Sequence, residues 1–245
     1  MGELIAVLSG KGGTGKTSLC AGIATALAQQ EQSVLCIDCD IGLRNLDISL
    51  GLSDQPALSF LDVCSGNYPL NQATQHPQFP SLRFLTAPVN CTAADIEKAD
   101  FQAFLRQAKE QFCYVLLDAP AGIERGFELC ARNADRILLV TNADPAAIRD
   151  ATRAAERLEL MGKNNARLLV NRVSKKLYET MHLTVDDIMD EAGLPLLGIV
   201  PEDPQVTLCA ALHKPLLQPR HKGAAAACRR IAQRILGCNV PIALR

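Results

Sequence analysis

A glycine-rich segment follows the first apolar run of the chain and limits its fold more than any other feature. It reads Gly10-Lys11-Gly12-Gly13-Thr14-Gly15-Lys16-Thr17-Ser18. This satisfies the phosphate-loop pattern of Gly, four residues, Gly, Lys and Ser or Thr. Glycines let backbone N–H groups face a phosphate, and the helix that follows presents its positive end to the same anion. The segment therefore predicts a strand, a loop and a helix that bind a nucleotide.

Two side chains of this loop have expected roles of their own. Lys16 is expected to contact the β- and γ-phosphates. Thr17 is expected to place its hydroxyl on Mg²⁺, a hard cation that prefers oxygen ligands. A glycine-rich turn that binds nothing is the alternative, and the apolar run before it and the helix-like run after it disfavour that alternative.

Short apolar runs recur along the chain, with helix-like segments between them. The runs are continuous rather than alternating in polarity, which is typical of strands buried on both faces. This order predicts an α/β fold, with a mostly parallel sheet of about seven strands flanked by helices on both faces. The expected strands are 3–8, 34–38, 114–118, 136–141, 167–171 and 196–200, with a seventh at 83–86, and the expected helices are 17–30, 92–111, 145–161 and 184–192.

Composition agrees with one packed domain over residues 1–245, with a short tail from about 238. The chain is 48% hydrophobic and 21% charged, with a formal net charge of -1, so it has ample apolar material for a core and no global basic excess for nucleic acid. Its start lacks the pattern of a signal peptide, and no apolar run approaches the roughly 18 residues of a membrane span. We therefore expect a cytoplasmic protein whose ten cysteines are reduced.

The nucleotide base and the metal are predicted by residues at the ends of other strands. GTPases read guanine with an Asn-Lys-x-Asp box, whereas here the strand ends in Asn171-Arg172-Val173-Ser174, so ATP is the predicted nucleotide. A strand-end cap is the alternative role for Asn171. Asp118 ends another apolar run, where a carboxylate can support the Mg²⁺ shell through a water molecule. Asp38 and Asp40 stand two residues apart, and one of them could orient the attacking water.

These residues resemble the ParA/MinD family of ATPases. The second lysine of the loop, Lys11, gives the deviant phosphate loop that marks the family, and the resemblance runs from about residue 3 to 237. Within the family, four segments look like those of the MinD branch. They are 37–47 with Asp38-Cys39-Asp40, 117–127 with Asp118-Ala119-Pro120, 147–151 with Arg149-Asp150, and 198–203 with Pro201-Glu202-Asp203.

The resemblance implies a switch that dimerises when ATP binds. In the family, two monomers meet face to face, and the lysine that matches Lys11 reaches across to the partner's phosphates. Asp40 matches the carboxylate that positions water, and Asp118 matches the Walker B aspartate. Lys11, Lys16 and Asp40 are thus the expected catalytic residues, with Thr17 and Asp118 at Mg²⁺.

The same resemblance implies a base site and partners. Asn171 matches the adenine reader, Arg172 follows it in the expected nucleotide site, and the loop Pro201-Glu202-Asp203 flanks the base. The segment with Arg149 and Asp150 falls on the helix that family members use to meet regulatory proteins. The implied function is placement of the division septum, with cycling on and off the inner face of the membrane.

The C-terminal region departs from the family pattern. Residues 223–237 are expected to form an amphipathic helix, which either lies on anionic lipid or docks on the sheet as the last helix of the fold, and docking is favoured. The remaining residues from Cys238 contain a central proline, Pro241, and make a poor membrane helix. Membrane binding is therefore left open.

Three other functions fit parts of the sequence. A DNA-partitioning ATPase would use a basic patch, for which Arg220-His221-Lys222 with Arg229, Arg230 and Arg234 are candidates. A flagellar-placement ATPase would share nearly every nucleotide residue. A metal-centre maturation ATPase would need paired cysteines such as Cys36 and Cys39, but no second pair has matching spacing. DNA is therefore an unexpected partner, and a metal role for these cysteines is disfavoured.

Overall fold

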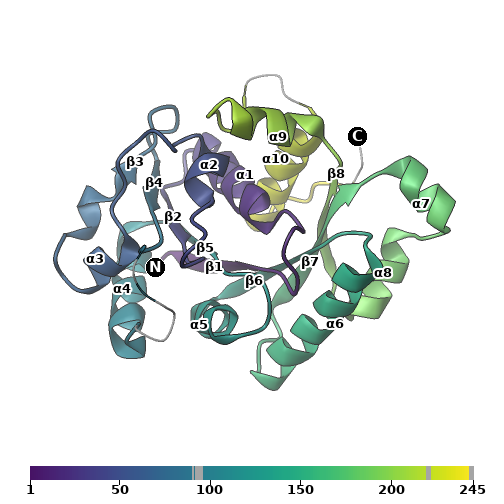
Figure 1. Ribbon diagram of the computed structural model, residues 1–245, viewed down its shortest axis with the longest axis horizontal. Coiled ribbons are helices and arrows are strands. Elements are labelled where there is room, and N and C mark those ends of the chain that lie inside the picture. The colour runs from purple at the N-terminus through teal and green to yellow at the C-terminus, as the bar shows by residue number, and fades with distance from the viewer. Residues whose placement is uncertain (90, 92–95, 219–221, 243–245) are drawn as a thin grey trace.

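A single eight-stranded sheet runs through the molecule (Figure 1). The computed structural model describes residues 1–89, 91, 96–218 and 222–242. The strand order is β3-β4-β2-β5-β1-β6-β7-β8, and every neighbouring pair is parallel except β3 with β4. The strands are β1 (Glu3–Leu8), β2 (Val34–Asp38), β3 (Thr74–Gln75), β4 (Leu82–Leu85), β5 (Tyr114–Asp118), β6 (Arg136–Thr141), β7 (Ala166–Val173) and β8 (Leu196–Pro201).

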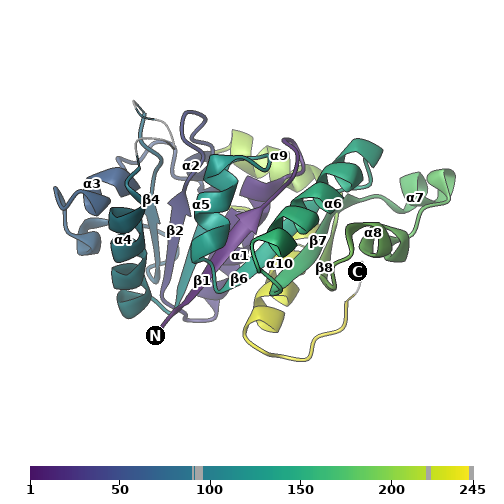
Figure 2. The same cartoon turned by 90° about the horizontal axis from the view of Figure 1, so that it is seen from below.

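Helices cover both faces of this sheet, as Figures 1 and 2 show. On one face, α1 (Lys16–Gln29) packs against α10 (Gly223–Ile235) and α2 (Leu46–Leu50), and α9 (Pro204–Ala211) lies on α2. On the other face lie α4 (Lys98–Gln111), α5 (Arg125–Asn133) and α6 (Pro145–Leu160). The remaining helices are α3 (Phe60–Cys64), beside α4, and α7 (Lys175–Met181) and α8 (Val185–Ala192), near β7 and β8.

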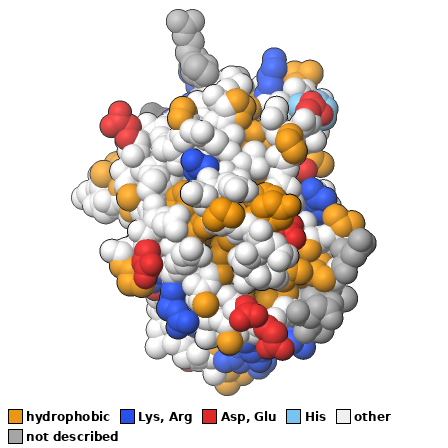
Figure 3. Space-filling view, turned by 90° about the vertical axis from the view of Figure 1, so that its left-hand side faces the viewer, with side chains coloured by type: hydrophobic (Ala, Val, Ile, Leu, Met, Phe, Trp, Pro, Cys, Tyr) orange, Lys and Arg blue, Asp and Glu red, His pale blue; other side chains and the backbone are white. Residues whose placement is uncertain are grey.

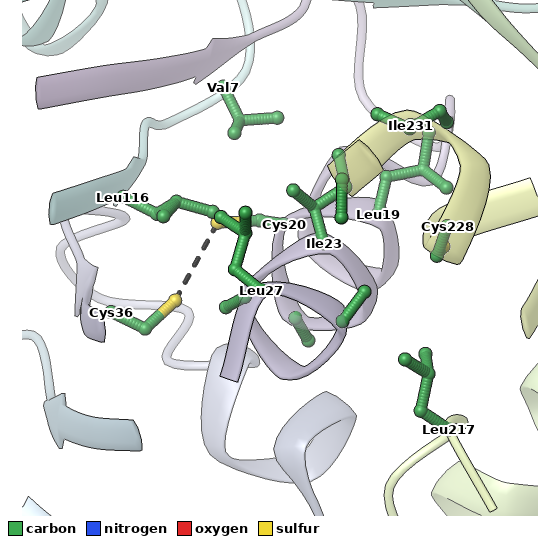
Figure 4. Packing of buried hydrophobic residues seen from close by; sticks show 14 of the residues in the cluster. Val7, Leu19, Cys20, Ile23, Leu27, Cys36, Leu116, Leu217, Cys228 and Ile231 are labelled. Carbon is green, nitrogen blue, oxygen red and sulfur yellow. Dashed lines mark hydrogen bonds between the residues drawn. The ribbon is translucent and has the colours of Figure 1, made fainter. Parts of the chain in front are cut away.

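The core under α1 explains why this helix is apolar on nearly every side. Leu19, Cys20, Ile23 and Leu27 are all buried, because α1 lies between the sheet and α10 (Figure 4). The Sγ atoms of Cys20 and Cys36 are 3.8 Å apart in this core. Within the described structure, Cys20, Cys36, Cys39, Cys64, Cys113, Cys130, Cys209, Cys228 and Cys238 form no disulfide.

The parallel register brings the carboxyl ends of the strands to one edge of the sheet. Asp38, the last residue of β2, pairs with Asp118, the last residue of β5. β1 lies on the other side of β5, and the glycine-rich loop follows it. Ligands of open α/β sheets bind at this edge, outside the carboxyl ends of the strands. The topology therefore gathers the expected site residues at one place.

The predicted fold class is confirmed, with differences in the number of short elements. The predicted strand 83–86 exists as β4, and an eighth strand, β3, adds two antiparallel residues at the sheet edge. The expected helix 92–111 begins at Lys98, and residues 92–95 lie outside the described residues. Five helices were not expected, namely α2, α3, α5, α7 and α9. Each is 5 to 9 residues long, which leaves few turns in which a helical period can be recognised, although the equally short α8 was predicted.

The packing of side chains shows where the last helix lies and whether Cys36 and Cys39 can act as a pair. The helix expected at 223–237 is α10, which buries Cys228, Ile231 and Ile235 against the sheet, so its docking is confirmed. Cys36 and Cys39 belong to cores on opposite faces of the sheet and do not face one another. None of the described helices has the length and apolar character needed to cross a membrane.

The face at the β3 end of the sheet differs from the edge that holds the site. Apolar side chains gather near the centre of this face, and charged side chains lie mostly toward its margins (Figure 3). From residue 52 to residue 81 the sequence has two charged residues, Asp54 and Asp62. The charged residues of the expected site lie elsewhere, at the carboxyl edge of the sheet.

Candidate nucleotide site

The glycine-rich loop has the backbone conformation that an anion site needs. Gly13 and Gly15 adopt left-handed φ values of 81° and 86°, which glycine tolerates without strain. Gly15 precedes the first residue of α1, and no side chain caps this helix end within the described structure. The first N–H groups of α1 therefore point toward the loop without a side-chain partner, and the helix dipole favours an anion there.

Gly10 has a different reason for being glycine. A Cβ atom at this position would lie 2.1 Å from the backbone oxygen of Asp150 in α6. Gly12 has much more room, since the nearest atom to an added Cβ is 4.0 Å away. A glycine at the first position of the loop therefore allows the close packing of the loop on α6.

Lys16 forms a buried ion pair with Asp118. The Lys16 Nζ donates to Asp118 Oδ1 at 2.6 Å, and the exposed fractions of the two side chains are 6% and 1%. Burial alone would lower the pKa of Lys16, but the charge of Asp118 raises it above its usual value. Burial raises the pKa of Asp118 in spite of the neighbouring amine. The predicted phosphate ligand and the predicted metal ligand therefore contact each other directly.

Several buried oxygens around this pair have no hydrogen-bond partner in the described structure. They are Ser9 Oγ, Thr14 Oγ1 and Asp118 Oδ2. Thr17 Oγ1 lies 3.5 Å from Lys16 Nζ. Because buried polar atoms are normally paired, unpaired oxygens at a glycine-rich loop indicate a place for a ligand. A carboxylate and a hydroxyl are the oxygen ligands that Mg²⁺ prefers, so this donor set fits the predicted Mg²⁺.

Asp38 holds the segment that contains Asp40. One oxygen of Asp38 accepts from the N–H of Asp40 at 2.9 Å, and the other accepts from the N–H of Leu46 at 3.2 Å. Burial and the charge of Asp118 raise the pKa of Asp38 to about 7. Burial also raises the pKa of the half-buried Asp40, and the charge of Lys16 opposes that rise. Asp38 thus fixes the segment between Asp40 and Leu46, while Asp40 is the more accessible carboxylate.

Lys11 contacts α6 rather than the loop that contains it. Its Nζ lies 3.1 Å from Asp144 Oδ2, and the exposed fractions of the two side chains are 37% and 48%. Asp144 also caps α6, where its Oδ1 accepts from the N–H of Ala146 at 2.8 Å. The Lys11 side chain and its hydrogen bond lower the pKa of Asp144. This exposed pair is the second ion pair formed by a lysine of the loop.

A small pocket lies between the loop, the end of β7 and the end of β8. Asn171 Nδ2 donates to the carbonyl of Thr14 at 2.8 Å, which fixes the orientation of the amide. Arg172 adopts a left-handed φ of 53° next to a register shift between β7 and β8. The pocket lining includes Gly15, Ser18, Asn171, Arg172, Pro201, Glu202 and Asp203.

The geometry thus brings the predicted residues together, adds Asp144, which the sequence did not single out, and gives Asp38 a role that was not expected. Asp144 was missed because its contact with Lys11 spans 133 residues. The anchoring role of Asp38 was missed, although its place two residues before Asp40 was noted. Of the candidate basic patch, which belongs to the disfavoured DNA-binding alternative, Arg220 and His221 lie outside the described residues, and Arg229 and Arg234 donate to backbone carbonyls of their own chain.

Known proteins share this sequence pattern and fold. The profile of the CobQ/CobB/MinD/ParA nucleotide-binding domain matches residues 5–216. The septum site-determining protein MinD of Synechocystis is 34% identical over 98% of this chain and 92% of its own length. The MinC:MinD cell division protein complex of Aquifex aeolicus has a chain with a TM-score of 0.90 and 36% identity, covering 98% of both chains.

A more distant structure has a nucleotide in its name. The septum site-determining protein MinD of Pyrococcus horikoshii, complexed with Mg-ADP, superposes with a TM-score of 0.82. It is 24% identical and covers 98% of this chain and all of that chain, 100%. At 24% identity, this similarity is evidence for a shared fold alone.

Proposed function

This chain belongs to the MinD branch of the MinD/ParA family of P-loop ATPases, and we propose that it is a switch that dimerises on ATP and hydrolyses it to control placement of the division septum. The observation that carries the proposal is the position of Lys11. Whereas Lys16 is paired with Asp118 inside the protein, this lysine is held at the surface by an exposed ion pair with Asp144, the N-cap of α6. Because an exposed ion pair contributes little to stability, Lys11 can leave Asp144 and bind another molecule at a small cost in free energy.

The phosphates of ATP would bind at the loop and the start of α1. Backbone N–H groups of the loop and the Lys16 ammonium would face them, and Lys16 would leave or share its bond with Asp118. Thr17 and Asp118 would hold Mg²⁺, Asp118 through a water molecule. Bound Mg²⁺ supplies positive charge that neutralises the phosphate oxygens.

Asn171 supports adenine as the base. Its Nδ2 is engaged by the Thr14 carbonyl, so its Oδ1 is the atom left to accept a hydrogen bond. Adenine carries an amino group that can donate to this oxygen, whereas guanine has a carbonyl at the corresponding position. The pocket therefore favours ATP over GTP.

Hydrolysis would depend on the position of Asp40. Its backbone N–H donates to Asp38. This hydrogen bond restrains the backbone of Asp40, so its carboxylate would need little rearrangement to contact the water. Phosphoryl transfer needs positioning more than a strong base. Asp40 would orient the attacking water, and replacing it with Ala is expected to slow hydrolysis and to retain the ATP-bound dimer. Normal turnover by Asp40→Ala would remove Asp40 from this role.

Dimerisation is the test of the whole proposal. In Mg-ATP the protein should elute as a dimer by size exclusion with light scattering, and in Mg-ADP as a monomer. Lys11→Ala should bind ATP but stay monomeric, because the charge that would reach the partner's phosphates is gone. Lys176→Ala, on the exposed surface of α7, is the matched control and should dimerise. Dimerisation of Lys11→Ala at the wild-type ATP concentration would contradict the proposal.

Partners and membrane contact belong to the same proposal. The Aquifex structure is a complex of MinD with MinC, which supports a division protein as partner. Arg149 and Asp150 lie on α6, whose backbone touches Gly10, so a protein bound there would contact an element linked to the loop.

Cycling on the inner face of the membrane is tested by co-sedimentation with anionic liposomes. Pelleting in Mg-ATP and not in Mg-ADP supports it, and no pelleting of a confirmed dimer rejects it.

A further inference from the structure

One carboxylate joins the starts of two helices beside the base pocket. Asp203 Oδ1 accepts from the N–H of Gln205 at 2.9 Å and so caps α9. Asp203 Oδ2 accepts from the N–H of Ala224 at 2.9 Å, in the first turn of α10. Both N–H groups belong to helix ends, which need such partners and whose dipoles favour a negative charge. Asp203 therefore uses both of its oxygens to hold α9 and α10 together.

The close approach of Asp203 to α10 depends on a glycine. Gly223 has a φ of 55°, and a Cβ atom added there would lie 2.3 Å from Asp203 Oδ2. Any other residue at this position would push the carboxylate away or shift the start of the helix. The hydrogen bonds and the glycine are separate observations, and both indicate a fixed junction.

The junction lies between two walls of the base pocket. Val206 and Thr207 of α9 line one side, and Leu216 and Ala224, before and within α10, line another. The two helices differ in how firmly they are held elsewhere. α10 packs extensively on α1 and β8, whereas in α9 Cys209 is the one buried residue.

Because α9 is loosely packed, another contact is needed to fix its position at the pocket. α9 also rests on α2, but Leu208 and the following Leu212 are 48% and 52% exposed, so little apolar burial holds the helix in place. The hydrogen bond to Ala224 attaches its first turn to the well-packed α10. Without it, the wall formed by Val206 and Thr207 would be held by α2, by the packing of the partly buried Val206 on the core, and by the chain connections of α9.

We propose that Asp203 is a positioning residue for the base pocket: it fixes α9 against α10, and through them the walls that receive the adenine, without reading the base itself. This inference rests on the proposed function, because it assumes that the pocket binds the base of a nucleotide. It predicts that losing Asp203 weakens binding of the base and leaves binding of the phosphates nearly unchanged.

The test compares a ligand that has a base with one that lacks it. The dissociation constants of Mg-ADP and Mg-tripolyphosphate are measured by calorimetry for the full chain and for Asp203→Ala. The affinity for Mg-ADP should fall about tenfold, the size expected for the loss of one helix cap. The affinity for Mg-tripolyphosphate should stay within about twofold, since the loop and Lys16 are untouched.

Two further variants distinguish positioning from a loss of stability. Asp203→Asn keeps one acceptor for a helix N–H and should fall between wild type and Asp203→Ala. Gly223→Ala should reproduce the selective loss of Mg-ADP. Thr184→Ala, which removes the cap of the equally short α8, and Gly193→Ala, which has a φ of 64° and no atom near the added Cβ, are the matched controls and should bind both ligands as wild type does.

The outcomes separate this inference from the function on which it rests. An equal loss of Mg-ADP and Mg-tripolyphosphate in Asp203→Ala, or no loss of either, would overturn the positioning role. Failure of the wild-type protein to bind Mg-ADP would instead overturn the nucleotide site. If Asp203→Ala does not fold, the comparison rests on Asp203→Asn and Gly223→Ala, with the same criteria.

Discussion

At the scale of single residues, the two lysines of the loop differ in how tightly they are held. The pair of Lys16 and Asp118 is buried, whereas the pair of Lys11 and Asp144 is exposed. Removing one partner of a buried pair leaves an uncompensated charge, which costs about 3–5 kcal/mol. An exposed pair is screened by water, so losing it costs much less. Lys11 is thus the lysine that can change partner at little cost.

The contact between Lys11 and Asp144 should oppose dimerisation. In Asp144→Asn the side chain still caps α6, but it no longer attracts the ammonium of Lys11. The dimer in Mg-ATP should therefore form at a lower protein concentration than in wild type, because neither protomer has to break this pair. Light scattering over a dilution series measures this threshold. Asp186→Asn, in the first turn of α8, is the control, and an unchanged or higher threshold for Asp144→Asn would contradict the argument.

His76 should make the stability of the fold depend on pH. Its Nε2 contacts the carbonyl of Leu50 at 2.9 Å, and its Nδ1 accepts from the N–H of Gln78 at 3.1 Å, so the neutral ring satisfies both atoms. Burial lowers the pKa of His76 from 6.5. The unfolded chain then binds a proton at a higher pH than the folded chain, so this contribution to stability is present above pH 6.5 and is lost as the pH falls below it.

The urea midpoint at pH 7.5 and at pH 5.5 measures this effect. It should fall more between these values in wild type than in His76→Gln, which lacks the titrating ring. His182→Gln, at an exposed position, should keep the wild-type dependence. Equal falls in wild type and His76→Gln would show that other groups cause the acid sensitivity.

At the scale of secondary structure, the sequence predicts elements that are long or carry a motif. The apolar runs of the central strands and the helices α1 and α6 are visible because burial on both faces or a helical period extends over many residues. The loop residues Lys16 and Thr17 follow from a fixed spacing. The short helices and β3 depend on their neighbours for stability, and so do the contacts of Asp38 and Asp144. Such contacts join residues that are distant along the chain, which a local pattern does not contain.

The contact of the loop with α6 gives a prediction that separates two glycines of one motif. Gly10→Ala forces a Cβ atom toward the backbone of α6, whereas Gly12→Ala meets no atom closer than 4.0 Å. Overpacking against backbone costs about 1–3 kcal/mol. In a chain of this size, each kcal/mol shifts the melting temperature by about 2–4 °C. Gly10→Ala should therefore melt about 2–12 °C lower than wild type.

Differential scanning fluorimetry without nucleotide measures this difference. Gly12→Ala should melt close to wild type in that experiment, whatever its effect on phosphate binding. A common melting temperature for Gly10→Ala and wild type would mean that α6 moves aside freely, and that Gly10 is required for another reason.

At the scale of the whole molecule, one sheet carries the two largest cores and the site. The core around α1 and α10 and the core around α4 and α5 lie on opposite faces of the same strands. The loop joins β1 to α1, and Asp38 and Asp118 end two strands of that sheet. A ligand that contacts these residues is therefore attached to the part of the molecule that both cores share.

Nucleotide should stabilise this shared sheet as a unit. At about 100 times its dissociation constant, a ligand that binds the folded state alone adds about 2.7 kcal/mol to the free energy of unfolding. Mg-ADP at that concentration should raise the melting temperature by about 5–10 °C in a single transition.

Mg-GDP at the same concentration should raise the melting temperature less, because Asn171 offers an acceptor to a base that carries a carbonyl. Lys16→Ala should lose most of the shift from Mg-ADP. Two separate transitions would show that the cores unfold independently, and equal shifts with both nucleotides would remove Asn171 as the residue that selects the base.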